Sequence, residues 1–358
     1  GVNAGNSIAS GGNYNVAVGD EAGTSITTGD SNTLVGMNAG DALTTAQYNV
    51  AIGHDALTTS ILGSRNIAIG TNALYATNPA SAVDMYNIAI GHNTGSAITT
   101  GIQNTLIGGL AGDALTTGQY NVAIGVDALS VEDTASKSVA VGTSALAVQN
   151  AGTVDAYNVA VGHNSGVNVT TGVQNTLIGG LAGDAITTGS YNTIVGYSAG
   201  GLLTGTLNAF VGRSSGSAMT SGTKNSILGS YNGNQGSLDL RTASNYIVLS
   251  DGDGNPRVVI TSGGDIRVPA TYNQTTGTGA NMVVDSSGNF QRSTSSLRYK
   301  NTVNDATHGL TELLTLRPVT YKGNNDGDKV FGGLIAEEVH DAGLTEFVTY
   351  NDDNEPDA

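Results

Sequence analysis

The sequence has no cysteine and no tryptophan, and only 5% of its 358 residues are aromatic. Without cysteine, neither disulfides nor thiolate metal sites can hold the chain together. With so few bulky aromatic side chains and 52 glycines, the chain cannot fill one large, thick core. The composition therefore argues against a globular metabolic enzyme.

Basic residues and long apolar runs are also scarce. The 13 Lys and Arg residues stand against 29 Asp and Glu residues, which gives a formal net charge of −16. Nucleic acid is a poor partner for such a chain, because phosphate binding needs a dense basic surface. No run of about 18 apolar residues is present to span a bilayer. We expect neither nucleic-acid binding nor membrane insertion.

What the sequence does contain is a short repeat of about 17 residues. Each unit reads Asn, a small or β-branched residue, an apolar residue, a β-branched residue or Leu, and Gly. The asparagine is replaced once, by Ser138. The glycines of the successive units are Gly19, Gly36, Gly53, Gly70, Gly91, Gly108, Gly125, Gly142, Gly162, Gly179, Gly196, Gly212 and Gly229. Such a fixed period is typical of repeat architectures.

A second, longer repeat is superimposed on the first. Two of the intervals are lengthened by insertions, Tyr75 to Met85 and Ala147 to Ala156. Tyr14, Tyr86 and Tyr157 open successive blocks that are 72 and 71 residues apart, each with about four short units. Residues 103–113 and 174–184 are identical. Tandem duplication built this region.

The short unit predicts one coil of a parallel β-solenoid. In Val16-Ala17-Val18, bulky β-branched residues alternate with a small one, which is the periodicity of a strand, and the following glycine permits a tight corner. Ile26 to Gly29 predicts a second short strand. Coils stack at about 4.8 Å, so thirteen would form a rod of roughly 60 Å. The asparagines would then form a hydrogen-bonded ladder between coils.

Residues 1–236 resemble the head repeats of trimeric autotransporter adhesins, whose Val-Ala-Ile-Gly units form a left-handed parallel β-roll. The resemblance implies a homotrimer. A single stack of such thin coils buries only small aliphatic side chains, so we expect one chain alone to be too slender. Because Gly1 to Gly5 already matches part of a coil, we expect further repeats upstream.

Composition changes near residue 237, where charged residues become more frequent. Tyr246 to Leu249 and Arg257 to Ile260 predict a β-hairpin within a region covering residues 237–270, and residues 271–294 predict an extended connector. The Asp251, Asp253, Asn255 spacing imitates the start of a calcium loop. Pro256 and Ser262 occupy the places of its required glycine and glutamate, so we expect a turn without calcium.

The C-terminal region, residues 295–358, contains two specific elements. Ser295-Ser296-Leu297-Arg298-Tyr299-Lys300 is followed, beyond an amphipathic segment at residues 309–316, by Gly333-Leu334-Ile335-Ala336-Glu337-Glu338-Val339. Together they resemble the intramolecular chaperone domain of phage tailspikes, endosialidases and tail fibres, with Glu337 where that family usually has Gln. The family's domain is α+β, trimerises, helps the upstream fibre to fold, and then cuts itself off. The chain ends at Ala358, before the long helices of that family, which implies a shortened domain.

Carried over from this family, Ser295 would be the nucleophile, Lys300 its partner and Thr294-Ser295 the bond that is cut. A lysine can accept the proton of a serine only where burial or a neighbouring cation lowers its pKa, and Arg298 is a candidate for that cation. The enzyme class implied is a single-turnover Ser/Lys autoprotease. Ser296 is an alternative nucleophile. From spacing alone a solvated strand edge is the favoured interpretation of the segment, and the family resemblance reverses that preference.

Other candidate sites are weaker. His54, His92 and His163 each follow a repeat glycine, where a threefold axis could gather imidazoles around a metal, but exposed corners are the simpler interpretation. Glu132 and Asp133 could suggest glycan hydrolysis, but a solvated turn is the default. We expect no metal and no cofactor.

Three functions follow from these observations. The first is a virion tail fibre, extracellular and homotrimeric, which binds other tail proteins and a host receptor or glycan. The second is a bacterial trimeric surface adhesin, and the third is a tailspike that depolymerises a surface polysaccharide. The two insertions are the predicted receptor contacts.

Overall fold

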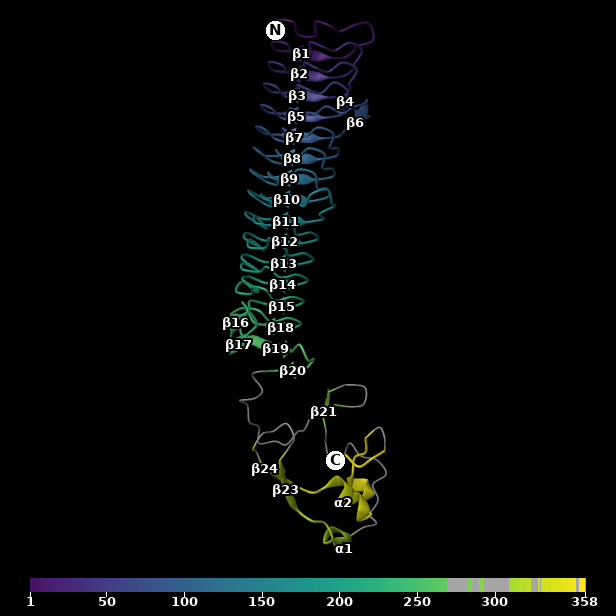
Figure 1. Cartoon of the computed structure of the whole chain (residues 1–358), viewed down its shortest axis with the longest axis vertical. Helices are drawn as coiled ribbons and strands as arrows, with labels where there is room; N and C mark the ends of the chain where they lie inside the picture. The colour runs from purple at the N-terminus through teal and green to yellow at the C-terminus, as the bar shows by residue number, and fades with distance from the viewer. Residues whose placement is uncertain are drawn as a thin grey trace. The chain divides into compact units, whose positions relative to one another are not determined.

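Figure 1 shows the computed structural model, which describes residues 1–268, 282–284, 290–292, 309–322, 328, 330–351 and 354–357. The chain divides into two compact units, residues 1–274 and 275–358, and each is described on its own. Among the described residues, no helix is long and apolar enough to cross a membrane. The first unit contains nearly all of the regular structure.

The first unit is a parallel β-solenoid, as the repeat predicts. Its main sheet has 16 strands, and from β1 to β18 each strand pairs in parallel with the next. Every coil therefore contributes one rung to the ladder (Figure 1). The rungs are β1 (Val16–Val18), β2 (Thr33–Val35), β3 (Val50–Ile52), β5 (Ile67–Ile69), β7 (Ile88–Ile90), β8 (Thr105–Ile107), β9 (Val122–Ile124), β10 (Val139–Val141), β11 (Val159–Val161), β12 (Thr176–Ile178), β13 (Thr193–Val195), β14 (Ala209–Val211), β15 (Ser226–Leu228) and β18 (Ile247–Ser250).

The other sides of each coil are turns. The prediction of a second strand at Ile26 to Gly29 is wrong, because the structure has bends there. The backbone N–H groups of Thr27 and Gly29 both donate to the carbonyl of Thr44 in the next coil, at 3.0 and 3.1 Å. A strand ladder needs separate acceptors for successive donors, so two donors sharing one carbonyl bend the chain.

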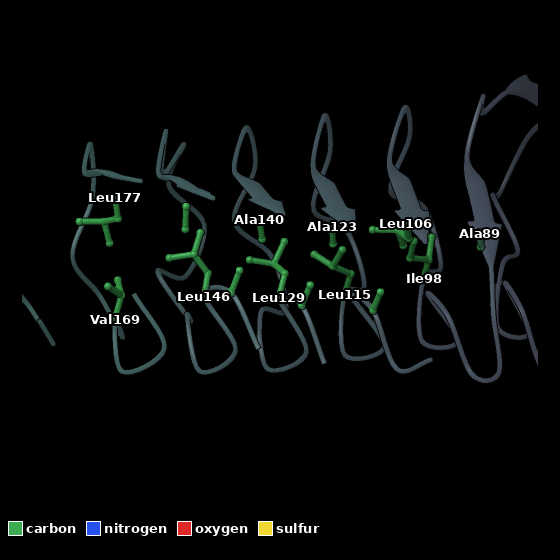
Figure 2. Close-up of a cluster of buried hydrophobic side chains, with 14 of the residues drawn as sticks. Ala89, Ile98, Leu106, Leu115, Ala123, Leu129, Ala140, Leu146, Val169 and Leu177 are labelled. Atoms are coloured by element: carbon green, nitrogen blue, oxygen red, sulfur yellow. The ribbon is translucent and has the colours of Figure 1, made fainter. Parts of the chain in front are cut away.

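The core of the solenoid closes within a single chain. The middle residue of each strand points inward, and Leu34, Ala51 and Leu106 are fully buried. These residues pack on apolar side chains from the turns, as Figure 2 shows for Leu106, Leu115 and Leu129. The inward-facing side chains are therefore buried by the coils of a single chain.

In most coils the strand centre and one turn position complement each other in side-chain volume. Where the strand centre is Leu106, the turn has Gly112, and an added Cβ there would lie 3.0 Å from a Leu106 methyl. Where the strand centre is Ala123, the corresponding turn residue is Leu129, which is fully buried (Figure 2). In these coils one large side chain fills the core, either from the strand or from the turn.

The glycine that ends each strand is required by the stacking of coils. Gly108 has a φ of 133°, which L-residues with side chains rarely adopt. A Cβ on Gly108 would also lie 2.5 Å from the carbonyl oxygen of Gly125 in the next coil. The repeated glycine is thus explained by both backbone geometry and space.

The asparagine ladder is present and buried. Asn104 Nδ2 donates to Asn87 Oδ1 at 3.2 Å and to the carbonyl of Gly118 at 2.9 Å. Its Oδ1 accepts the backbone N–H of Asn121 at 3.0 Å. Each buried amide therefore links three coils, and the same pattern recurs along the rod for Asn32, Asn49, Asn66, Asn175, Asn192, Asn208 and Asn225.

The end of the solenoid is antiparallel. β18, the last parallel rung, forms the predicted hairpin with β19 (Pro256–Ile260), which pairs with β20 (Ile266–Arg267). The described residues also form four small two-stranded sheets, of which three come before residue 293. These three are β4 (Gly63–Ser64) with β6 (Val83–Asp84), β16 (Asn234–Gln235) with β17 (Leu238–Asp239), and β21 (Met282–Val284) with β22 (Phe290–Arg292).

The second unit has few regular elements among its described residues. A short helix, α1 (Leu310–Leu313), lies within the predicted amphipathic segment. The antiparallel pair β23 (Val319–Lys322) and β24 (Val330–Gly333) follows, then α2 (Ala336–Asp341) and the 3₁₀ turn η3 (Thr345–Phe347). These elements show both helices and strands, in line with a small α+β unit.

Replacing Asn104 by Ala tests how much the ladder contributes to stability. The change leaves the Asn121 N–H and the Gly118 carbonyl without their partner and removes one of the two donors to Asn87 Oδ1, and each buried group left unpaired costs about 1–3 kcal/mol. We expect Asn104→Ala to lower the free energy of unfolding by about 2 kcal/mol or more in denaturant titrations. Gln103→Ala, at the preceding surface position, is the control and should change it by less than about 0.5 kcal/mol. Equal effects of the two variants would contradict this role for the ladder.

Candidate functional site

An apolar strip runs along the outside of the rungs. The two outer residues of each strand flank the buried centre, and the second of them is Val, Ile or Leu in every rung. Neither outer position holds a charged residue in any rung. The first residue of the strand is apolar in nine rungs and Thr or Ser in five. The strip comprises these first residues together with Val18, Val35, Ile52, Ile69, Ile90, Ile107, Ile124, Val141, Val161, Ile178, Val195, Val211, Leu228 and Leu249.

The strip is only partly covered by the chain itself. Val18, Leu228 and Leu249 are 55%, 56% and 42% exposed, and the rungs between them are partly exposed. Contiguous exposed apolar surface on this scale marks an interaction site in soluble proteins. Sequence analysis recognised the alternation in each strand but missed that its outer positions align into one continuous face.

The predicted catalytic residues lie outside the described residues. This applies to Ser295, Arg298 and Lys300, to the alternative nucleophile Ser296 and to Thr294. The second element of the motif, residues 333–339, is described: Gly333 ends β24 and Ala336 begins α2. Glu337 lies in the first turn of α2, where a carboxylate is favoured by the helix dipole.

An apolar groove is the main feature of the second unit. It is lined by residues of α1, β23, α2 and η3 and of the segments next to them, including Leu313, Val319, Leu334 and Phe347. Leu313, Leu334 and Phe347 are each at least half exposed. Beside the groove, Arg317 forms an ion pair with Glu338 of α2, and this pair lowers the pKa of the Glu338 carboxyl. The ion pair thereby links α2 to the segment between α1 and β23 at the edge of the groove.

Glu132 is a structural residue rather than part of a solvated turn, so that expectation is wrong. It is fully buried, and its Oε1 accepts the backbone N–H of Ala135 at 2.9 Å. Its Oε2 accepts Gln149 Nε2 at 2.9 Å, and Gln149 also donates to Ser138 at 3.0 Å. Asn158 Nδ2 donates to Gln149 Oε1 at 2.7 Å. Gln149 thus restores the ladder where Ser138 interrupts it, which leaves Glu132 engaged and enclosed.

The histidines occupy exposed corners, as expected. His54, His92 and His163 all lie on the surface, and His54 Nδ1 is 3.2 Å from Asp55. In the part of the chain that the structure describes, no group of three or more His, Asp or Glu residues is placed to hold a metal ion. The carboxyl of Asp251, in the turn with calcium-like spacing, is hydrogen-bonded within its own turn.

In that turn, Asp251 Oδ1 accepts the backbone N–H groups of Asp253 and Asn255 at 3.1 and 2.9 Å. Arg257 donates to Asp251 Oδ2, at 3.0 Å from its Nε. The N–H of Asn255, together with Arg257, lowers the pKa of the Asp251 carboxyl from 3.8 to about 2. The calcium-like spacing therefore encodes a hydrogen-bonded hairpin turn.

The Asp251 turn predicts a local acid transition. The pKa of the Asp251 carboxyl is lower in the folded protein than in the unfolded chain. The ionised carboxyl therefore stabilises the turn fully above pH 3.8, and this stabilisation is lost as the pH falls toward 2. Amide exchange at Asn255 should accelerate over that range, and NMR titration of the Asp251 carboxyl carbon should give a midpoint near 2. Asp251→Asn should abolish this pH dependence, whereas Asp253→Asn should leave it. A midpoint near 3.8 would contradict the assignment.

Comparison with known proteins gives no match for this chain. No protein-family model, no curated protein and no solved structure is similar to it. The parallel solenoid is a fold shared by proteins of different function, so the function has to be argued from the chain's own surfaces.

Proposed function

We propose that the chain is the distal part of a homotrimeric viral tail fibre, which presents a host-attachment surface on a stiff solenoid shaft. The observation that carries this proposal is the apolar strip, which continues without a charged residue through every rung. A monomeric shaft would leave this face in water over a length of roughly 60 Å, given about 4.8 Å per rung.

Other copies of the same chain are the occupants that fit the strip. Its apolar residues recur once per rung, at the rise of the strand ladder. Only another rod with the same rise can place a matching side chain against every rung, and a copy aligned in parallel does so by construction. A threefold arrangement closes such an interface around one axis, and the resemblance to trimeric adhesin heads supports three copies.

The C-terminal part is proposed to act as the intramolecular chaperone of the fibre. The motif resemblance supports this role, and so does the half-exposed apolar groove, because an assembly factor needs apolar surface to hold partly folded chains. Ser295 Oγ would attack the Thr294 carbonyl carbon while Lys300 accepts the hydroxyl proton, and the bond to the Ser295 nitrogen would break as Lys300 returns that proton to the nitrogen. Water would then hydrolyse the resulting ester between Thr294 and Ser295 Oγ and free the shaft. Released shafts would remain in the virion tail, outside the host cell, attached to other tail proteins.

The alternatives receive less support. A bacterial surface adhesin would use the same shaft, and the trimeric strip fits it equally, but the C-terminal motif favours the viral fibre. A depolymerising tailspike needs a pair of accessible carboxyls, and Glu132 is enclosed by Gln149 and backbone N–H groups. Glycan attachment without hydrolysis is therefore preferred to glycan hydrolysis.

Lysines introduced into the strip should separate the trimer. Ile107→Lys combined with Ile124→Lys places six ammonium groups in a threefold interface, at a cost of several kcal/mol for each one that is desolvated. We expect the wild-type chain to sediment as a trimer and the double variant as a folded monomer with an unchanged circular dichroism spectrum. Val126→Lys with Leu202→Lys, at exposed apolar positions off the strip, should remain trimeric. A monomeric wild type, or a trimeric strip variant, would refute the strip as the interface.

Self-cleavage is tested by intact-mass analysis and denaturing gels. The wild-type chain should yield a fragment that ends at Thr294, and both Ser295→Ala and Lys300→Ala should stay whole. Ser296→Ala is the control that should still be cut, and its failure together with cleavage of Ser295→Ala would move the nucleophile to Ser296. An intact wild-type chain would leave the C-terminal unit as a permanent part of the fibre.

A further inference from the structure

Tyrosines line one edge of the solenoid on alternate rungs. They occupy the position just before the ladder asparagine, and the chain at this position is stacked coil upon coil by backbone hydrogen bonds. The tyrosine column consists of Tyr14, Tyr48, Tyr86, Tyr120, Tyr157 and Tyr191, which precede β1, β3, β7, β9, β11 and β13 (Figure 1). From Tyr48 to Tyr191 the rings are 45–51% exposed, and Tyr14 is 87% exposed.

The rungs between the tyrosines carry polar side chains. Ser31, Arg65, Gln103, Lys137 and Gln174 hold the same position in the intervening coils. Only four basic residues occur in residues 1–236, and three of them, Arg65, Lys137 and Lys224, lie at this position. Aromatic and basic residues that are rare elsewhere on the shaft are therefore gathered along one line.

Two clusters along the column have the same construction. Arg65 lies over the ring of Tyr48, 4.6 Å from its centroid, and is 5.8 Å from the centroid of Tyr86. Its Nε is 2.9 Å from Asp84 Oδ2. Asp84 belongs to β6, where the first insertion returns to the coil and pairs with β4.

The second cluster repeats this arrangement four rungs away. Lys137 Nζ is 2.6 Å from Asp155 Oδ2 and 5.1 Å from the centroid of the Tyr157 ring. It also donates to the Tyr157 hydroxyl at 3.0 Å, and Tyr120 precedes it on the rung before. Asp155 lies at the end of the second insertion, held by a parallel bridge to Ser136. Both insertions thus deliver a carboxylate to a cation that lies between two tyrosines.

Folding does not require tyrosine at these positions. The backbone there is left-handed, with φ of 54° at Tyr86 and 60° at Tyr120. Asn is the residue that tolerates this conformation best after Gly, and Asn245 occupies it in the last rung. A bulky, half-exposed ring in a backbone conformation that disfavours it indicates selection for a surface property.

We propose that the tyrosine column binds an extended, β-linked polysaccharide of neutral sugars lying along the rod. The apolar C–H face of a pyranose stacks on an aromatic ring, and alternate sugars of an extended β-linked chain present the same face. Tyrosines two rungs apart are separated by about 9.6 Å, which is close to that repeat. This inference rests on the proposed attachment function and names its ligand class.

The polar groups of the column favour a sugar over other ligands. Gln103, Gln174 and the two cation–carboxylate pairs offer donors and acceptors to ring hydroxyls between the stacking positions. Because Arg65 and Lys137 are neutralised by Asp84 and Asp155 on an acidic shaft, an anionic polymer is disfavoured. A polyproline helix has a similar repeat, but it offers no row of hydroxyls to these polar side chains.

The test uses the full chain and soluble probes. Affinity electrophoresis through gels containing hydroxyethyl cellulose or glycol chitin, with titrations of cellohexaose and chitohexaose, measures binding. Tyr120→Ser combined with Tyr157→Ser should weaken binding about tenfold through the loss of two stacking contacts. Tyr120→Phe with Tyr157→Phe should retain it, because the rings remain. Tyr197→Ser, at an exposed tyrosine off the column and outside both insertions, is the control and should bind as the wild type.

Several outcomes would overturn the proposal. They are no binding of the wild type to any of the four probes, an unchanged affinity in the serine variant, or binding of a proline decapeptide instead of the sugars. Loss of the trimer in the serine variant would assign the column to the subunit interface. The two proposals can fail separately. If the Ile107→Lys/Ile124→Lys variant shows that the strip is not an interface, glycan binding to the tyrosine column can still be measured. If no probe binds, the sedimentation of the wild type and of that variant still tests the trimer.

Discussion

The strand spacing of the ladder is the constraint on which the rest of this structure depends. Every coil must repeat the backbone hydrogen bonds of its neighbour at a rise of about 4.8 Å, so each position in the coil becomes a column along the rod. Gly108 and its equivalents follow from this constraint, because a Cβ would meet the carbonyl of the next coil. The buried asparagines follow as well, because a side chain that satisfies one coil at this spacing satisfies the next.

This constraint also makes irregular residues informative. A serine in the asparagine column would leave a gap, and the second insertion supplies Gln149 to fill it, supported by the enclosed carboxylate of Glu132. The exchange between Gly112 and Leu129 follows the same logic in the apolar core. Departures from the repeat are thus compensated within one or two coils, because each coil contacts only its neighbours.

How far the sequence predicts the structure differs from element to element. The solenoid, its rungs and its asparagine ladder are predictable because Asn, β-branched residues and Gly recur at fixed positions, and the Asp251 hairpin is predictable from its turn residues. The conformation of Ile26 to Gly29 is not predictable in this way. Its Ile-Thr-Thr pattern suits a strand locally, but two of its N–H groups share the Thr44 carbonyl of the next coil, which bends the chain. The closed single-chain core and the enclosure of Glu132 depend on contacts between coils, which no local pattern specifies. The catalytic assignment at Ser295 and Lys300 lies outside the described residues and stays a prediction.

The length of the duplicated block has a consequence for how such a rod can grow. The blocks opened by Tyr14 and Tyr86 each contain four rungs, which is an even number. Tyrosines occupy odd rungs, so adding or deleting a whole block preserves the parity of the column, whereas gaining a single coil would place two tyrosines or two polar residues side by side. Rod length can therefore change in steps of four rungs without altering the alternation of tyrosine and polar residues along the column. The block of four rungs, and not the single coil, is the unit that can be duplicated or deleted without disturbing this surface.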